Sequence, residues 1–262
     1  MGKMRWKQSI KLPVQALRRK LTCSNLLLDV LHQAVMFSAP LQLRTEMWEI
    51  SNLQGIDIEE VAALNLDYEL SGLACTTAAF PGPNGYRVLR ALDWDIPASM
   101  CRTIRWEEIA PGVRIRQVEG YVGVVTGHNQ AGHFFLSLNR AENCEWSLDG
   151  TPIAWLIREA LLQPTAEAAR AFLMHAKPLV GGYVTIIAPD HATWLEVQPG
   201  FTEVRKHVQY PRMLVVGNLD KGEPEKTQAV EAWVRRGARA ARDPELFPAY
   251  STATTDIVSA VV

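Results

Sequence analysis

The sequence predicts a mixed α+β protein in which helices and strands are grouped along the chain. The first 74 residues carry apolar side chains mostly at helical spacing. At Cys75 the pattern changes to short strand-like segments separated by Gly, Pro and Asn. Two helical segments and then further strands follow. Runs of strands beside runs of helices are typical of layered α+β domains, because βαβ units would interleave them.

The helices are predicted from apolar spacing and from residues that can cap them. In the helix expected over Ile58–Leu70, Asp57 can serve as N-cap and Glu60 as its capping-box partner. A helix is also expected over Thr165–His175, with Thr165 and Glu167 at its start. The other expected helices share the three-and-four spacing and are Val14–Met36, Ile153–Leu162 and Pro224–Arg242.

The strands are predicted from alternation and from the turn residues between them. Pro83, Asn84 and Gly85 form a turn that joins a strand over Cys75–Ala79 to one over Tyr86–Asp93. The remaining expected strands are Val113–Val118, Tyr121–Thr126, His133–Leu138, Tyr183–Ala188, Thr193–Gln198, Met213–Gly217 and Thr254–Val262.

Composition and charge exclude several classes of protein. With 262 residues and 48% hydrophobic residues, the chain can bury a full core as one large domain or two small ones. The 27 basic and 28 acidic residues nearly balance, which argues against a general nucleic-acid binder. The four cysteines are too few and too scattered for a secreted disulfide framework.

Basic residues are concentrated near the start of the chain. Seven Lys and Arg residues precede the first acid, Asp29, with no signal-peptide pattern and no apolar run that spans a bilayer. We therefore expect a cytoplasmic protein. The basic segment is interpreted as one face of a solvated helix, with peripheral contact to anionic lipid as the alternative.

Motifs for common cofactors and metals are missing from the sequence. There is no glycine-rich dinucleotide loop after a strand, no Walker loop, no G-x-S-x-G elbow and no H-E-x-x-H motif. We accordingly expect no cofactor and no metal, and no nucleic acid as partner.

Cys75 is the candidate nucleophile, because it stands where the helical part ends and small residues surround it. Arg90 follows fifteen residues later and Asp93 three after that. If the strands on either side of the Pro83–Gly85 turn pair, both charges return beside the thiol. A nearby cation lowers the pKa of a thiol, and the thiolate is the reactive form. The alternative interpretation is a structural cysteine in an apolar site.

Several segments in order resemble acid ceramidase and N-acylethanolamine acid amidase, which are N-terminal-nucleophile cysteine hydrolases related to choloylglycine hydrolase. The matching segments are 56–70, Cys75-Thr76-Thr77, Arg90-Ala91-Leu92-Asp93, 120–127, 134–140, 152–158 and 215–220. The resemblance covers about residues 45 to 260.

The resemblance implies a four-layer αββα sandwich with a helical N-terminal segment, made as an inactive precursor. Self-cleavage between Ala74 and Cys75 would divide one structural domain into residues 1–74 and 75–262, which stay associated. The α-amino group released on Cys75 has a pKa near 7.7–8.0, so the nucleophile can supply its own base.

The resemblance also implies the role of each site residue. Cys75 attacks the amide carbonyl and forms a thioester. Arg90 stabilises the thiol anion, and Asp93 holds the new α-amino group. The side chain of Asn218 and the backbone N–H around Asn139 donate to the oxyanion.

The function implied is hydrolysis of a linear N-acyl amide, such as a fatty-acyl amide. Within the same superfamily, the alternatives are a bile-salt or penicillin-type acylase and an acyltransferase. A third alternative is an uncleaved, inactive homologue that acts as a binding module, since Arg140 stands where the family often has an acid.

Overall fold

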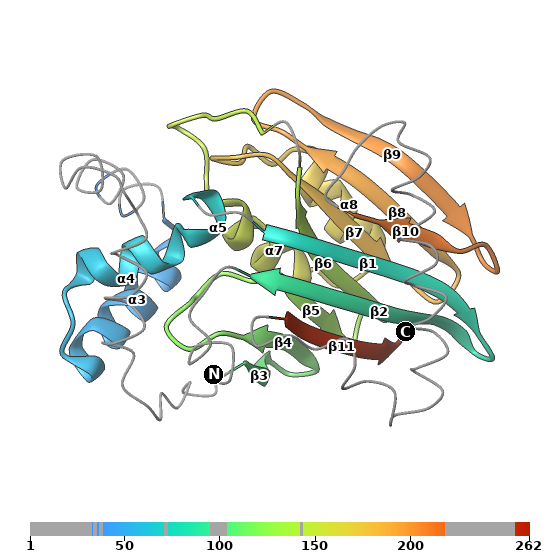
Figure 1. Ribbon diagram of the computed structural model, residues 1–262, viewed down its shortest axis with the longest axis horizontal. Coiled ribbons are helices and arrows are strands. Elements are labelled where there is room, and N and C mark those ends of the chain that lie inside the picture. The colour runs from blue at the N-terminus through green and yellow to red at the C-terminus, as the bar shows by residue number, and fades with distance from the viewer. Residues whose placement is uncertain are drawn as a thin grey trace.

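The computed structural model describes residues 39–70, 73–94, 104–141, 144–217 and 255–262, together with residues 33 and 36. Within them the protein has the predicted mixed α+β architecture, built on two antiparallel sheets (Figure 1). The helices expected over 14–36 and 224–242 lie outside the described residues, apart from residues 33 and 36, which are helical.

The smaller sheet has four strands in the order β10-β1-β2-β11, and the larger has seven in the order β3-β4-β5-β6-β7-β8-β9. The strands of the smaller sheet are β1 (Leu73–Gly82), β2 (Gly85–Trp94), β10 (Leu214–Val216) and β11 (Thr255–Val261). Those of the larger are β3 (Arg105–Ala110), β4 (Val113–Gln117), β5 (Thr126–Asn129), β6 (Phe134–Arg140), β7 (Gly182–Ile187), β8 (His191–Val197) and β9 (Thr202–Gln209).

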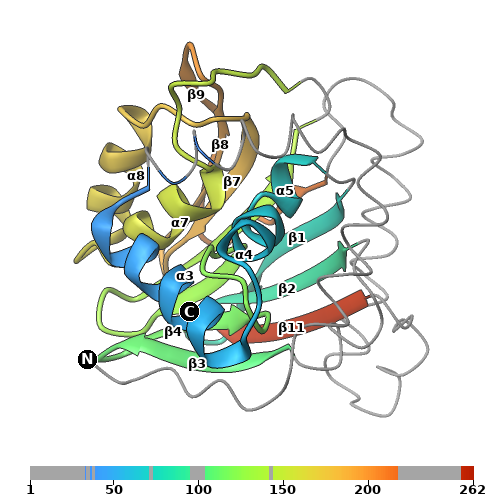
Figure 2. The ribbon, with the colours of Figure 1, turned by 90° about the vertical axis from the view of Figure 1, so that its left-hand side faces the viewer.

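The helices lie in two groups. Helices α7 (Ile153–Leu161) and α8 (Ala166–Met174) cover one face of the larger sheet (Figure 2). Helices α3 (Leu41–Gln54), α4 (Ile58–Asn65) and α5 (Asp67–Leu70) lie at one end of the sandwich, beside the start of β1 (Figures 1 and 2).

The two sheets pack face to face around a buried apolar cluster. Ala79 and Val88 from the smaller sheet meet Phe135 and Ile187 from the larger one in this cluster. The opposite face of the larger sheet packs on α7, where Trp155 is fully buried. The described residues thus form one helical layer and two sheet layers. Residues 224–242, where a further helix is expected, are not among them.

One strand prediction is wrong. Residues 121–125 are irregular, and β5 begins only at Thr126. Backbone N–H groups of this segment bond to a side chain and to a helix carbonyl, not to a neighbouring strand. Val122 N–H donates to Asn65 Oδ1 (2.6 Å), and Val124 N–H donates to the carbonyl of Ala154 (2.9 Å). The segment is apolar because it is buried among helices, and such burial resembles a strand pattern in the sequence.

Two strands were missed, and both are edge strands. β3 and β9 end the larger sheet and carry charged side chains on partly exposed faces. Charge on an edge strand discourages pairing with other chains. It also weakens the apolar alternation by which a strand is recognised.

The helix predicted over Ile58–Leu70 is divided at Leu66 into α4 and α5. Asp57 occupies the N-cap position, as expected, but its side chain makes no capping hydrogen bond. The carbonyl of Asp57 instead accepts from the N–H groups of Glu60 and Val61. The interruption lets α5 turn toward the sheets, where it meets β6.

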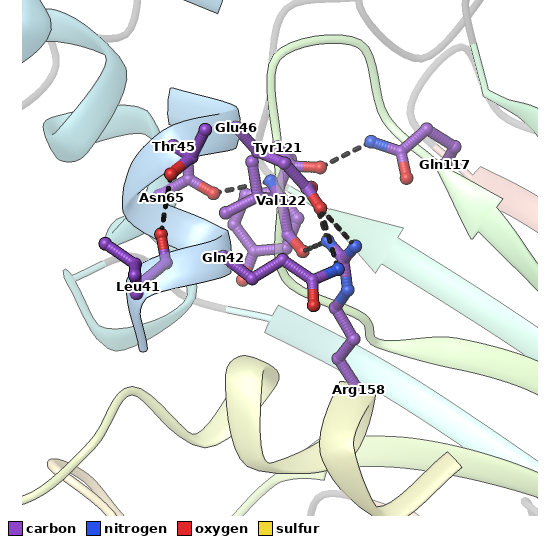
Figure 3. A network of polar contacts seen from close by, with 9 residues as sticks. All are labelled: Leu41, Gln42, Thr45, Glu46, Asn65, Gln117, Tyr121, Val122 and Arg158. Carbon is purple, nitrogen blue, oxygen red and sulfur yellow. Dashed lines mark hydrogen bonds and ion pairs between the residues drawn. The ribbon is translucent and has the colours of Figure 1, made fainter. Parts of the chain in front are cut away.

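A partly buried ion pair ties the N-terminal helices to the sandwich (Figure 3). Arg158 on α7 is only 3% exposed, and its two terminal nitrogens donate to the two carboxylate oxygens of Glu46 on α3 at 2.7 and 2.6 Å. Arg158 also donates to the carbonyl of Val122 (2.9 Å). Two parallel hydrogen bonds fix geometry more tightly than a single contact, so α3, α7 and the 118–125 segment are held together.

Among the helices that the structure describes, none combines the length and the hydropathy that a transmembrane segment requires.

Candidate active site

The site begins with the register of two strands. β1 and β2 pair antiparallel across the turn, as predicted, with Cys75 opposite Leu92 and Thr77 opposite Arg90. Residues directly opposite in such a pair share a face, and the face alternates along each strand. Cys75, Thr77 and Arg90 therefore lie on one face. Diagonal neighbours on such a face are about 7–8 Å apart, within reach of a long side chain.

This face is turned toward the larger sheet. The hydroxyl of Thr77 lies 2.8 Å from that of Ser137 on β6, and both side chains are fully buried. Cys75 is 4% exposed and forms no disulfide. The thiol thus lies at the interface between the sheets, near the start of β1, which is beside α5 (Figure 1).

Arg90 crosses this interface and is fully buried. Its Nη2 donates to the carbonyl of Leu138 (2.5 Å), and its Nη1 donates to Thr77 Oγ1 (3.1 Å) and to the side-chain oxygen of Asn139. A longer contact runs from Nε to Thr126 Oγ1 (3.4 Å). The planar guanidinium suits such a fork of acceptors.

The partners of Arg90 within the described part of the chain are all neutral oxygens. A buried charge needs hydrogen bonds to offset the loss of water, and these contacts supply them. Neutral acceptors do not cancel the charge, however. Among the contacts that the structure describes, no acid offsets the guanidinium charge, and a cation of this kind favours a thiolate or an oxyanion beside it.

Asn139 connects the two sheets around Cys75. Its side-chain nitrogen donates to the carbonyl of Val216 on β10 (3.0 Å) and, at 3.4 Å, to the carbonyl of Cys75. Its side-chain oxygen accepts from Arg90 and Thr77. The resemblance implies that the backbone N–H around Asn139 donates to an oxyanion, and this role stays a prediction.

Two predicted site residues are not fully described. Asp93 lies on β2 opposite Ala74 and, on the other side, opposite Thr255 of β11; its side chain lies outside the described part. Asn218 follows the last described residue after β10 and is outside the described residues altogether. The structure therefore brings together Cys75, Arg90 and Asn139 and does not place the other two side chains.

Sequence reasoning missed the hydroxyl groups of this cluster. Thr77 is two residues after Cys75, Ser137 is two before Asn139, and Thr126 pairs with Ser137 across β5 and β6. A period of two marks residues on one face of a strand. Counting two positions from each predicted site residue would have found Thr77 and Ser137.

His128 and Cys144 are two further titratable groups that the structure describes. Burial raises the pKa of the Cys144 thiol, which donates to the carbonyls of Ala141 and Gly181. Burial also lowers the pKa of His128, and Arg114 adds to this effect. Among the residues that the structure describes, no group of His, Cys, Asp and Glu is arranged to hold a metal ion.

Comparison with known proteins finds a likeness among solved structures. No family model matches the chain, and no curated protein sequence matches it. The chain is similar in structure to an N-acylethanolamine-hydrolyzing acid amidase ortholog from Caenorhabditis elegans. The two are 17% identical with a TM-score of 0.46, over 56% of this chain and 71% of that one.

Proposed function

We propose that the chain is a hydrolase of linear N-acyl amides whose nucleophile is Cys75, exposed by self-cleavage after Ala74. One observation carries the proposal: Cys75 and Arg90 share a buried face between two sheets, and the described partners of Arg90 leave its charge uncancelled. A thiol beside such a cation is more acidic and therefore more reactive.

Self-cleavage begins when the Sγ of Cys75 adds to the carbonyl carbon of Ala74. The bond between that carbon and the nitrogen of Cys75 breaks, and the thiol proton passes to the nitrogen. The product is a thioester with a free primary amine. Water then hydrolyses the thioester, which leaves a carboxylate on Ala74 and restores the thiol. The Asn139 amide, at the carbonyl of Cys75, holds the backbone on the far side of the cut.

Turnover repeats this chemistry on a substrate. The α-amino group of Cys75 takes the thiol proton, and the sulfur attacks the substrate amide. The amine product leaves with a proton, and water hydrolyses the acyl thioester. Arg90 stabilises the anion of the thiol, Asp93 holds the α-amino group, and Asn218 and the backbone at Asn139 bind the oxyanion. An oxyanion donor of this kind is worth about 3–4 kcal/mol.

The proposed substrate is a fatty-acyl or similar amide.

After the cut, the piece that contains α3, α4 and α5 stays bound to the rest of the chain. This is supported by the Glu46–Arg158 pair and by apolar residues such as Met47 that share a core with Trp155. Peripheral contact of the basic N-terminal segment with anionic lipid is part of the same proposal. No cofactor is needed for these steps.

Denaturing mass spectrometry of the purified protein tests the cut. We expect two species that correspond to residues 1–74 and 75–262. Cys75→Ala should leave one species of 29.2 kDa, whereas the control Cys144→Ala should be cleaved as the wild type is. A wild-type chain that stays intact at every pH contradicts the hydrolase and supports the binding module.

The substrate class is tested on cleaved protein with acyl-coumarin amides of increasing chain length. Release of coumarin that rises with chain length is expected for a fatty-acyl amidase. Equal inactivity on all of them, by protein that has been cleaved before Cys75, contradicts the amidase.

A further inference from the structure

Tyr68 belongs to the helical segment before the predicted cut, yet it reaches the polar cluster around Cys75. It lies on α5, and its side chain is fully buried. Its hydroxyl donates to the backbone carbonyl of Asn139 (3.1 Å), and its own carbonyl accepts from Nη1 of Arg140 (3.1 Å). Two consecutive residues of β6 are thus held by one residue of α5.

The contact of Tyr68 complements that of Arg90. Arg90 holds the carbonyl of Leu138, and Tyr68 holds the next carbonyl, that of Asn139. Adjacent peptide groups in a strand point to opposite sides. With both held, the backbone at Asn139 has little freedom to rotate, and so its side chain stays between Arg90 and the carbonyl of Cys75.

The place for the Tyr68 hydroxyl is built into the sheet. Gly182 on β7 pairs with Arg140, and a Cβ added at Gly182 would lie 2.9 Å from the Tyr68 hydroxyl oxygen. It would lie equally close to side-chain carbons of Leu138 and Ile153. The missing side chain of Gly182 therefore gives the hydroxyl its room.

The electrostatic surroundings keep Tyr68 a hydrogen-bond donor. Burial raises the pKa of Tyr68 well above its usual value, and the charges of Cys144, Cys75 and Glu69 raise it further, against a lowering by Arg140. The phenol is therefore neutral at every pH at which the proposed enzyme would act.

We propose that Tyr68 is a positioning residue for the nucleophile, which acts through Asn139 to hold Arg90 and the backbone of Cys75. The inference rests on the proposed function, because Cys75 must be the nucleophile for its position to matter in turnover. It also gives residues 39–70 a role after the cut. This part of the precursor then completes the site and is not a disposable leader.

The test compares Tyr68→Phe with Tyr86→Phe, since each variant removes only a hydroxyl. Tyr86 is a matched control, because it is also fully buried and donates to a backbone carbonyl, that of Arg212 (2.7 Å), at the other end of β2 from Leu92. Two readouts are needed. One is kcat and KM on an acyl-coumarin amide; the other is the pH profile of alkylation of Cys75 by iodoacetamide, followed by mass spectrometry of its peptide.

We expect Tyr68→Phe to lower kcat by about tenfold while KM stays within about twofold, because only the geometry at the thiol changes. The alkylation profile of Cys75 should move to higher pH, since Arg90 is less firmly held. Tyr86→Phe should match the wild type in both readouts. If Tyr68 only stabilised the fold, Tyr68→Phe and Tyr86→Phe would change kcat and the alkylation profile to the same extent.

The results separate this inference from the proposed function. If the wild type is cleaved and active but Tyr68→Phe matches Tyr86→Phe in kcat and alkylation, the inference is wrong and the function stands. If the wild type is inactive, the function is wrong, and the alkylation profile alone decides whether Tyr68 positions Cys75.

A second variant applies if Tyr68→Phe fails to fold. Gly182→Ala keeps the hydroxyl but crowds it together with the side-chain carbons of Ile153 and Leu138, and should shift the alkylation profile in the same direction. Gly200→Ala is its control, because the nearest atom to an added Cβ there is 3.9 Å away. Equal profiles for the two alanine variants refute the inference.

Discussion

Arg90 on the smaller sheet donates a hydrogen bond to the side-chain oxygen of Asn139 on the larger sheet, and both residues are fully buried. The two lie 49 positions apart in the sequence. Their contact joins the sheets at the level of Cys75, whose carbonyl accepts from the amide of the same Asn139. The geometry of the proposed nucleophile therefore depends on how the two sheets pack.

Replacing Arg90 by lysine tests this dependence. A lysine ammonium is a compact donor and cannot reach the carbonyl of Leu138, Thr77 and Asn139 in the planar fork that Arg90 uses. Acceptors left without a donor cost about 1–3 kcal/mol each when buried. We expect the free energy of unfolding in urea to fall by about 2–4 kcal/mol, and self-cleavage to slow strongly.

The control for this change is Arg114→Lys, because Arg114 is exposed and stacks on Trp106. It should leave the urea midpoint and the cleavage rate unchanged. If Arg90→Lys cleaves itself as fast as the wild type does, the fork of hydrogen bonds is not needed for the reaction.

Removing the carboxylate of Asp93 tests the proposed handling of the new terminus. The backbone of Asp93 is paired with Ala74, the residue before the cut. If its side chain holds the α-amino group, Asp93→Ala should lower kcat on an acyl-coumarin amide by about 100-fold or more, within the usual range for general-base catalysis. The exposed Asp190 supplies the control, Asp190→Ala, which should be fully active. Near-normal rates in Asp93→Ala would remove this residue from the mechanism.

Breaking the Glu46–Arg158 pair should destabilise the protein. In Glu46→Gln, Arg158 keeps its charge in a nearly buried place without a carboxylate. Loss of one partner of a buried pair costs about 3–5 kcal/mol, and since Glu46 keeps some exposure we expect about 2–3 kcal/mol in urea denaturation. The exposed Glu49 on the same helix gives the control Glu49→Gln.

A double variant separates the charge from the packing. Glu46→Leu combined with Arg158→Met removes both charges at once, so it should recover part of the stability lost in Glu46→Gln. After cleavage, Glu46→Gln should also release residues 1–74 at lower urea than the wild type, as followed by size-exclusion chromatography. Unchanged release would show that other contacts hold the piece.

The burial of Tyr68 predicts a loss of stability in alkali. The pKa of Tyr68 is raised in the folded protein, so the unfolded chain loses the phenol proton first, at a pH of about 10. The contribution of the buried phenol to stability is complete below that pH. It declines as the pH rises toward the higher pKa of Tyr68 in the folded protein. The free energy of unfolding of the wild type, measured in urea, should therefore fall between about pH 9.5 and pH 11.

Tyr68→Phe should flatten this alkaline slope, because phenylalanine does not titrate. Tyr86→Phe should also flatten it, because burial and Asp190 raise the pKa of Tyr86. Identical slopes for wild type and Tyr68→Phe would mean that the phenol of Tyr68 ionises equally easily in both states.

The sequence predicted elements wherever local pattern and tertiary environment agree. The turn at Pro83–Gly85 and its two strands were found, because the turn residues lie directly between the strands that they join. The helix that begins after Thr165 was found for a similar reason: the Thr165 hydroxyl accepts from the N–H of Ala168, three residues on. Both signals are contained in a few neighbouring residues.

The predictions failed where distant residues decide the backbone. Residues 121–125 are apolar enough for a strand, but Asn65 and the carbonyl of Ala154 take their N–H groups. The edge strands β3 and β9 were missed because their charges suit solvent on one side.

For the site, the sequence by itself determined that Cys75, Arg90 and Asp93 lie on two strands joined by one turn, since pairing across a short turn follows from local geometry. Only the tertiary structure decided that Asn139 joins Cys75 and Arg90, and that Tyr68 reaches Asn139. These contacts cross between separate elements. A hydrogen bond between residues far apart in the chain depends on how the sheets and helices pack, and no local pattern records that packing.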